Sequence, residues 1–304
     1  MDEFEARATE RPQAAELMAA ARVPVFLLDD HQSLRPDEVG NAAYLQRLAK
    51  ELGYEPEVSD LAGMFRGGGS ERYQRWVQRA LGLGVAGPEG WEPDGRTQLL
   101  VAHSPEDLDE FIRARQLEGA TARITAGFCW PWNKPQGQEL PLDVEIGEWR
   151  RPWNVKKGGK VDHAPVSDLW ATDPRGIGQI GCVYTAQTFE YDWNGVIIGP
   201  DLVWRDDKFE VDRAATKDSE LRRQKVSDED AKRCIRNAYH VLLTRGVVGT
   251  VVYATDPQTQ DALRKLVPGS LGRAPQTPGN PNPPLIAEGN AIPPRYRKPP
   301  RRQD

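Results

Sequence analysis

The sequence predicts an α/β fold in which a parallel sheet is flanked by helices. Short apolar runs alternate with amphipathic stretches along most of the 304 residues, which is typical of strands and helices that follow one another. The run at 23–28 is apolar without interruption, as expected of a strand buried on both faces. The stretch 247–254 is rich in β-branched residues and favours another strand.

Strands and helices alternate in this prediction. The strands lie at 23–28, 98–102, 122–126, 179–185, 195–199 and 247–254. The helices cover 37–52, the residues after Ser70, the residues after Ser104, 227–243 and the residues after Asp256. Their starts are marked by small polar residues such as Ser70 and Ser104, because a side-chain oxygen there accepts a hydrogen bond from an amide of the first turn.

Two regions break the alternation. Residues from about 127 to 175 are rich in Trp, Pro, Gly and Lys, so we expect a long excursion there in place of a strand–helix unit. The tail at 267–304 is rich in proline and ends in arginines and lysines. Such a composition buries too little apolar surface to order the chain, so we expect this tail to be disordered.

Composition argues against several classes of protein. No stretch approaches the roughly 18 apolar residues of a membrane span, and no basic start followed by an apolar run marks a secretory signal. Cys129, Cys182 and Cys234 are far apart, which argues against a disulfide framework and a structural zinc site. We therefore expect a cytoplasmic protein with no membrane partner and no metal site. The net charge of −5 means that nucleic acid binding would need a local basic patch.

The segment 27–36 carries the first candidate functional residues. An apolar strand that ends in Asp, His and Gln places polar groups where ligands bind in open α/β sheets. Gln32 is suited to orient a water molecule or to contact a phosphate oxygen. From this segment alone, a polar loop after a core strand is the more common explanation.

The segment 181–201 carries the second set. Thr185, Gln187, Glu190 and Asp192 bring a hydroxyl, an amide and two carboxylates to one strand end. Such groups suit ribose hydroxyls or a nucleic-acid backbone. An ordinary connection between two strands is the alternative.

The segment 236–256 carries the third candidate. Arg245 follows an apolar helix end and precedes a glycine and a strand. An arginine at such a junction can project into a neighbouring site and neutralise phosphate charge. The alternative is an arginine that only complements the dipole at the helix C-terminus.

Together and in this order, these segments resemble motifs of superfamily 1 helicases, and most closely those of the Schlafen-type DNA/RNA helicase-like family. The segment 28–38 (Leu-Asp-Asp-His-Gln-Ser-Leu-Arg-Pro-Asp-Glu) resembles helicase motif III. The resemblance implies that Gln32 senses the γ-phosphate of a bound nucleotide. The segment 61–66 is similar to motif IV, which implies that Phe65 flanks the adenine and that Arg66 reaches the phosphates.

The resemblance continues to about residue 258. The segment 125–132 matches a stretch characteristic of the family, and 185–190 is similar to motif V. We expect Gln187 and Glu190 to contact the nucleotide and Thr185 to contact nucleic acid. The segment 237–246 is similar to motif VI, which implies that Arg245 is an arginine finger. The ordered series of motifs is far more specific than any one of them.

The sequence departs from the family pattern in two places. Thr188 stands where motif V normally has glycine, which allows a conformation or a close approach that a β-branched side chain resists. The phosphate-binding motif G-x-x-x-x-G-K-[ST] does not occur in the printed sequence, and no apolar strand that ends in an Asp-Glu box for Mg²⁺ lies upstream of the motif III segment. In the family both elements precede the position at which this sequence begins.

The resemblance implies a RecA-like fold and a division of labour. In such helicases ATP lies between two RecA-like lobes. Residues 1–40 would be the remnant of a first lobe and 41–266 the second lobe, with its insertion at about 127–175. We expect ATP and Mg²⁺ to bind only if a first lobe is supplied, and no cofactor to bind the isolated chain. The expected partner is that lobe or another chain that covers 23–28. The alternative is a non-catalytic module that binds nucleic acid or protein on the same scaffold.

The insertion carries the predicted nucleic-acid surface. Trp130 and Trp132 lie near Lys134 and several other basic residues, a combination that suits stacking and electrostatic binding of single-stranded DNA or RNA. The alternative, given equal weight, is that these tryptophans pack in the core or in a lid and that the lysines lie on a solvated loop.

Overall fold

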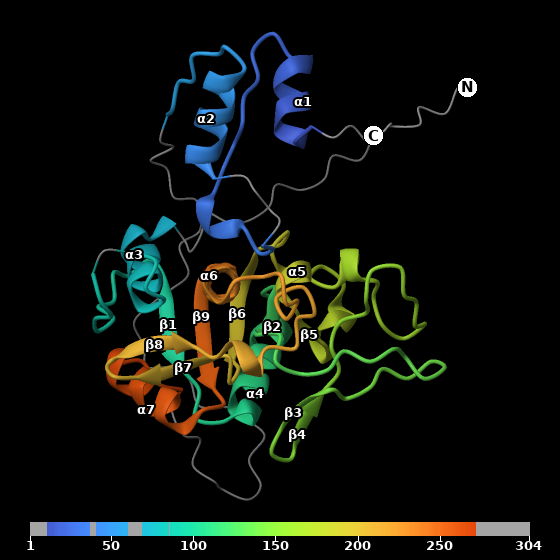
Figure 1. Ribbon diagram of the computed structural model, residues 1–304. Coiled ribbons are helices and arrows are strands. Elements are labelled where there is room, and N and C mark those ends of the chain that lie inside the picture. Colours follow the sequence, from blue (N-terminus) through green and yellow to red (C-terminus); the bar gives the residue numbers. More distant parts are fainter. Residues whose placement is uncertain (1–10, 37–40, 60–68, 85, 272–304) are drawn as a thin grey trace, which may run out of the picture. The chain divides into compact units, whose positions relative to one another are not determined.

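A parallel five-stranded sheet forms the centre of the protein (Figure 1). The computed structural model describes residues 11–36, 41–59, 69–84 and 86–271. The strand order is β1-β9-β6-β2-β5. The strands are β1 (Gln98–Val101), β2 (Ala122–Ala126), β5 (Ile180–Gly181), β6 (Tyr191–Ile198) and β9 (Gly246–Ala254). The predicted α/β class, a RecA-like parallel sheet flanked by helices, is confirmed.

Most of the predicted helices begin where their caps predicted. The helices are α1 (Gln13–Ala20), α2 (Ala42–Glu51), α3 (Glu71–Ala80), α4 (Pro105–Leu117), α5 (Val183–Ala186), α6 (Asp228–Leu243) and α7 (Pro257–Leu266). Ser70 caps α3, Ser104 caps α4, Ser227 caps α6 and Asp256 caps α7, each with its side chain. The predicted helix 37–52 corresponds to α2, which begins after Asn41; residues 37–40 lie outside the described part.

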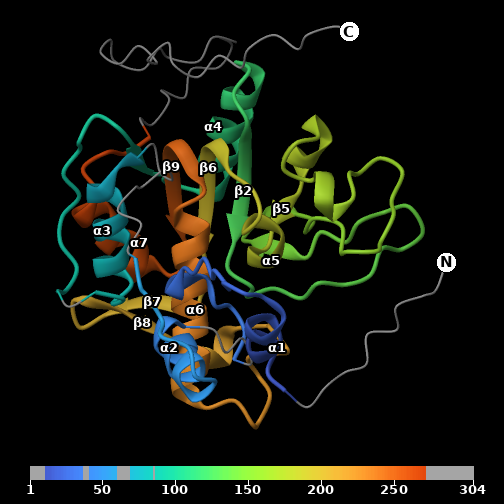
Figure 2. The same cartoon turned by 90° about the horizontal axis from the view of Figure 1, so that it is seen from above.

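The two faces of the sheet are covered by different elements. Successive side chains of a strand point to opposite faces, so Val196 and Ile198 of β6 join the core under α6, whereas Ile197 joins the core under α4. Figure 2 shows α4 and α6 on opposite sides of the sheet. Both faces are therefore buried, as the near-continuous apolar strands require.

Two hairpins were not predicted. β7 (Leu202–Arg205) and β8 (Lys208–Val211) are joined by Asp206 and Asp207, whose φ angles are 48° and 57°. A two-residue turn of this kind usually contains glycine or asparagine, so the aspartates gave a weaker signal. The second hairpin, β3 (Val144–Ile146) and β4 (Trp149–Arg151), lies inside the insertion, which is otherwise mostly irregular, as expected.

The prediction of a strand at 23–28 is wrong. These residues have no strand assignment and pair with no described strand. Val23, Val25 and Leu27 are 75%, 78% and 81% exposed, while Phe26 packs against a small cluster formed by α1 and α2. An apolar run becomes a parallel strand only beside strands that pair with it, and the described residues offer none there.

The prediction of a strand at 179–185 is mostly wrong. Only β5 is extended, and the chain turns at Cys182 into the short helix α5, which contains Thr185. At the other end of the chain, residues up to Leu271 are described, and Ser270 pairs with Val101 beside β1. The remainder of the predicted disordered tail, 272–304, lies outside the described residues.

Candidate functional site

Segments far apart in the sequence meet around α6. The short 3₁₀ helix η1 (Asp30–Gln32) and the residues after it lie against this helix. The side-chain amide of Asn237 donates to the carbonyl oxygen of Ser33 at 2.9 Å, and the rings of His31 and His240 lie 5.0 Å apart. The segment that resembles motif III is thus in contact with the segment that resembles motif VI.

The α5 helix completes this junction. The guanidinium of Arg35 lies over the ring of Tyr184, 5.2 Å from its centre. The Tyr184 hydroxyl donates to the carboxylate of Asp218, and burial together with this carboxylate raises the pKa of Tyr184. Leu34, 3% exposed, is buried in the same core cluster as Val183. The three predicted segments are therefore neighbours in the structure.

The predicted site residues of these segments differ in their partners and in their exposure. The side-chain amide of Gln32 donates to the carboxylate of Asp29 at 2.8 Å, on the partly exposed side of η1. Phe65 and Arg66 lie outside the described residues, so their predicted roles stay predictions. Gln32 thus bonds within its own segment, whereas Arg245 bonds to residues of α5 and α6.

Arg245 is buried, with 2% of its surface exposed. Its Nε donates to the carbonyl oxygen of Val241 at 2.9 Å, and Nη1 donates to that of Gln187 at 3.1 Å. The first bond satisfies a carbonyl of the last turn of α6, which agrees with an arginine that complements the C-terminal end of its helix. The second joins the end of α6 to the end of α5.

The other residues of the motif V segment differ in exposure. Thr185 accepts a hydrogen bond from the Asn154 amide at 3.0 Å, and Gln187 offers its carbonyl oxygen to Arg245. Glu190 is exposed. Within the described residues, the non-glycine positions with positive φ are Asp206 and Asp207. Thr188 is therefore not in the left-handed conformation that would have required glycine.

The tryptophans of the insertion form an aromatic cluster with Phe128. Trp153 is 2% exposed and lies at its centre, with ring centroids 6.3 Å from Trp130 and 5.6 Å from Trp132. Lys156 lies over the Trp132 ring and donates to its carbonyl oxygen at 2.7 Å. Trp130 and Trp132 are partly buried and Lys134 is exposed. The cluster is thus a packed core with an open rim.

A buried polar cluster that the sequence did not suggest lies at the carboxyl ends of β2 and β6. The Tyr239 hydroxyl donates to the Asp201 carboxylate and accepts from the amide of Gly199 at 2.9 Å. Cys129 is buried beside Asp201. A Cβ atom on Gly127 would lie 1.9 Å from the Tyr239 hydroxyl oxygen. The glycine and the tyrosine, distant in sequence, gave no local pattern by which to find them.

Comparison with known proteins decides the family. The model of the family "Schlafen group 3, DNA/RNA helicase domain" matches residues 2–256. The chain is a member of this family. Uncharacterized protein YPL245W of Saccharomyces cerevisiae is 33% identical over 278 residues, which cover 82% of this chain. The chain spans 58% of the length of that yeast relative. No solved structure matches.

Among the described helices of this Schlafen-family helicase domain, none combines the length and the apolar character needed to cross a bilayer.

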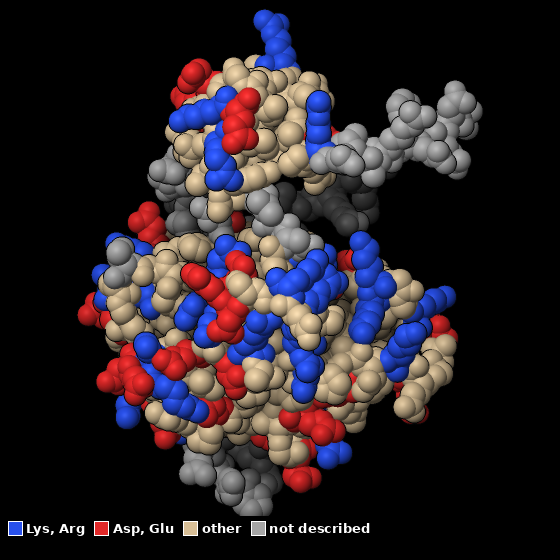
Figure 3. Space-filling model, viewed as in Figure 1, with Lys and Arg blue, Asp and Glu red and all other residues tan. Residues whose placement is uncertain are grey.

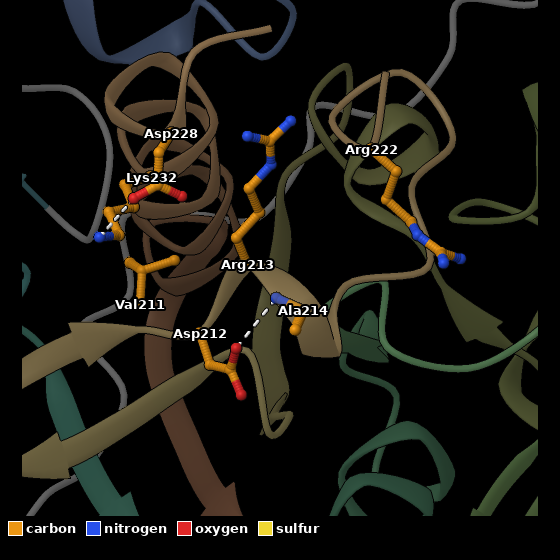
Figure 4. Close-up of a pocket in the computed structure, with 7 residues that line it drawn as sticks. All are labelled: Val211, Asp212, Arg213, Ala214, Arg222, Asp228 and Lys232. Carbon is orange, nitrogen blue, oxygen red and sulfur yellow. Dashed lines mark hydrogen bonds and ion pairs between the residues drawn. The ribbon is translucent and has the colours of Figure 1, made fainter. Parts of the chain in front are cut away.

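A surface pocket of about 470 Å³ lies between η5 (Arg213–Ala215) and the start of α6 (Figure 4). Its Lys232 is paired with Asp228 at 2.6 Å, and its Arg213 donates to the carbonyl oxygens of Leu221 and Arg223. Lys232 and Arg213 are thus engaged within the domain, whereas Arg222, which also lines the pocket, is exposed.

We expect Asp201→Asn to change how the stability of the Schlafen-family domain depends on pH. Burial raises the pKa of Asp201 above its ordinary value. The native state then binds this proton more tightly than the unfolded chain, so the stabilisation is complete below about pH 4 and is lost as pH rises through the raised pKa. The free energy of unfolding of the wild type should therefore fall, relative to Asp201→Asn, between pH 4 and pH 8.

Urea unfolding of the two proteins at several pH values measures this difference. Other titrating groups are common to both proteins and cancel when one free energy is subtracted from the other. A difference that stays constant from pH 4 to pH 8 would contradict the expectation.

Proposed function

We propose that this chain is the second-lobe part of a superfamily 1 DNA/RNA helicase-like ATPase and needs a first RecA-like lobe to bind and hydrolyse ATP. The observation that carries the proposal is the meeting of three helicase-like segments at α5 and α6. The contacts of Ser33 with Asn237 and of Arg245 with Gln187 support it. Membership in a helicase domain family supports it independently.

Two of the side chains predicted to act on a nucleotide, Gln32 and Arg245, bond to other groups of this chain. The Arg245 guanidinium faces backbone carbonyl oxygens inside the protein, and the Gln32 amide faces Asp29. The glycine-rich loop and lysine that hold the phosphates in P-loop proteins are missing from the printed sequence. In the proposed arrangement a first lobe would supply phosphate and Mg²⁺ binding, while this chain would contribute Gln32, Arg66 and Arg245 from the other side.

We expect the purified chain to show no ATP hydrolysis above background in a colorimetric phosphate assay with Mg²⁺, because the phosphate-holding half of the site is missing. Addition of a separately expressed first lobe from the same family, which carries the P-loop, should restore hydrolysis. Gln32→Ala should then lower the restored rate about 10²-fold, as expected of a residue that stabilises the transition state.

Gln258→Ala is a matched control, because this glutamine is exposed in the first turn of α7. Mg²⁺-dependent hydrolysis by the chain alone would refute the proposal if it disappeared in Gln32→Ala and not in Gln258→Ala.

The exposed residues of 23–28 are the proposed contact for the first lobe. Val23, Val25 and Leu27 present apolar side chains to solvent in a segment that has no helix or strand assignment. An exposed apolar segment that pairs with no described strand can add as a strand to another chain. A first lobe that added a strand here would bury these side chains and place Gln32 close to the lobe boundary.

We further propose that single-stranded DNA or RNA binds at the rim of the aromatic cluster. Trp130 and Trp132 are partly exposed, and the exposed Lys134 follows Trp132 by two positions. In Figure 3, lysine and arginine side chains gather across the face that carries the insertion and the segment before α6. The exposed basic residues of these two segments include Lys134, Lys157, Lys160, Lys217, Arg222 and Lys225. Ring stacking and phosphate pairing are the interactions that such proteins use for single strands.

We expect the logarithm of the association constant for a fluorescent (dT)20 or (U)20 oligonucleotide to fall linearly with the logarithm of the salt concentration. Lys134→Ala should reduce the slope by about 1, since one phosphate contact is lost. Trp132→Ala should weaken binding by roughly 1–3 kcal/mol. Lys208→Ala, a lysine on β8 already paired with Glu210 at 3.0 Å, is the control. A salt slope unchanged by Lys134→Ala, together with an affinity unchanged by Trp132→Ala, would contradict the assignment of this surface.

A second candidate function is a non-catalytic module that binds nucleic acid or protein. The buried position of Arg245 favours it, because an arginine engaged with two backbone carbonyl oxygens stabilises a scaffold without any nucleotide. The experiment with the added first lobe separates the two functions. Hydrolysis would be restored only for the helicase-like ATPase.

A further inference from the structure

The start of α5 is bonded to a residue of the insertion. Cys182, at the cap position, makes no capping hydrogen bond with its own side chain. The side chain of Asn154 bonds to both sides of this first turn: its oxygen accepts from the amide of Cys182 at 3.2 Å, and its nitrogen donates to the Thr185 hydroxyl at 3.0 Å. Asn154 has no exposed surface. The start of α5 therefore depends on a side chain that comes from another part of the chain.

Asn154 is also tied to the aromatic cluster. It follows Trp153, the ring at the centre of that cluster. The backbone on both sides is paired with β5: the amide of Asn154 donates to Ile180 at 2.8 Å, and the amide of Ile180 donates to Pro152 at 2.9 Å. A displacement of Trp153 thus displaces Asn154, because the two are adjacent residues of one extended and paired segment.

The far end of α5 is held by Arg245, which donates to the carbonyl oxygen of Gln187 at 3.1 Å. A helix of four residues has little stability of its own, because helix formation begins with an unfavourable first turn. Its order therefore depends on contacts with the rest of the protein, which include the burial of Val183 and the hydrogen bond of Tyr184 to Asp218. Of the contacts at its two ends, the insertion supplies one and the end of α6 supplies the other.

We infer that Asn154 is a positioning residue that couples the aromatic cluster of the insertion to α5, the segment that resembles motif V. The coupling to a ligand rests on the proposed binding of single-stranded nucleic acid at Trp132 and Lys134. A nucleic-acid strand whose bases stack on the rim of the aromatic cluster restrains Trp153 and Asn154. This restraint reduces local unfolding of α5. Linkage requires the reverse effect as well, so whatever orders α5 tightens binding at the rim.

Hydrogen exchange on the full chain, read by mass spectrometry over 182–190, tests the positioning role without any ligand. Asn154→Leu should speed exchange in α5 by roughly tenfold, since two buried hydrogen bonds are lost. Asn133→Leu is the matched control, because the Asn133 side chain bonds to Asp143 within the insertion. Equal exchange of α5 in Asn154→Leu and in the wild type would overturn the inference.

The second experiment repeats the hydrogen-exchange measurement in the presence of (dT)20. In the wild type the oligonucleotide should slow exchange of α5. Thr185→Val, which keeps the shape but removes the hydroxyl partner of Asn154, should abolish this slowing at a (dT)20 concentration that still saturates the variant, and Thr185→Ser should restore it. This pair also decides the question if Asn154→Leu does not fold. Equal slowing in Thr185→Val would overturn the coupling. If (dT)20 does not bind at all, the nucleic-acid proposal and the coupling both fail, whereas the ligand-free arm still decides the positioning role.

Discussion

Trp153→Ala should lower the free energy of unfolding by roughly 3–5 kcal/mol, the usual cost of removing a large buried aromatic side chain. Trp153 is 2% exposed and contacts the rings of Phe128, Trp130 and Trp132. Its indole N–H donates to the carbonyl oxygen of Pro131 at 2.8 Å, so truncation also leaves a backbone acceptor without this donor. Urea unfolding measured by circular dichroism gives the change.

Leu142→Ala is the control for the same insertion. Leu142 is 52% exposed, and a substitution at such a position usually changes stability by no more than about 0.5 kcal/mol. If Trp153→Ala cost no more than Leu142→Ala, the aromatic cluster would not be a packed core, and the insertion would be a loosely attached loop.

Gly127→Ala should destabilise the protein by about 3 kcal/mol, at the upper end of the usual cost of overpacking. The added Cβ would lie 1.9 Å from the hydroxyl oxygen and 2.6 Å from Cζ of Tyr239. The tyrosine cannot move freely, because its hydroxyl is bonded to Asp201 and to the amide of Gly199. The measurement is again the free energy of unfolding in urea.

Gly178→Ala is the matched glycine control, since no atom lies within 4 Å of its added Cβ. Combining Gly127→Ala with Tyr239→Phe removes the closest clashing atom, so the double variant should lose less than the sum of the two single losses. Additive losses would show that the clash with the tyrosine hydroxyl is not the cause.

Local patterns predicted most of the sheet and its helices. An apolar run marks the second half of β6 and β-branched residues mark β9, and Ser70, Ser104, Ser227 and Asp256 mark helix starts through short-range hydrogen bonds. Both signals depend on neighbours in sequence. The run at 23–28 has the same apolar pattern as the buried strands, but its strand state needs a pairing partner, and no local pattern reports whether one is present.

The sequence indicated which segments meet at the candidate site, but not where their side chains point. The order of the three segments indicated that they would meet, and they do so around α5 and α6. The direction of each side chain depends on tertiary contacts that motifs do not encode. Arg245 is turned inward by two carbonyl oxygens, and Asn154 acts on residues that follow it by about thirty positions.

The strand order has a consequence for how the protein is made. β1 lies at one edge of the sheet and pairs with β9, so that Leu100 is opposite Val251. During synthesis, β1 leaves the ribosome long before β9 has been made. Its apolar residues therefore stay unpaired until nearly all of the domain has been translated. Pairing across such long stretches of chain folds slowly, and the waiting intermediate is exposed to aggregation. A nascent chain stalled before residue 246 should therefore depend on chaperones in a way that the finished domain does not.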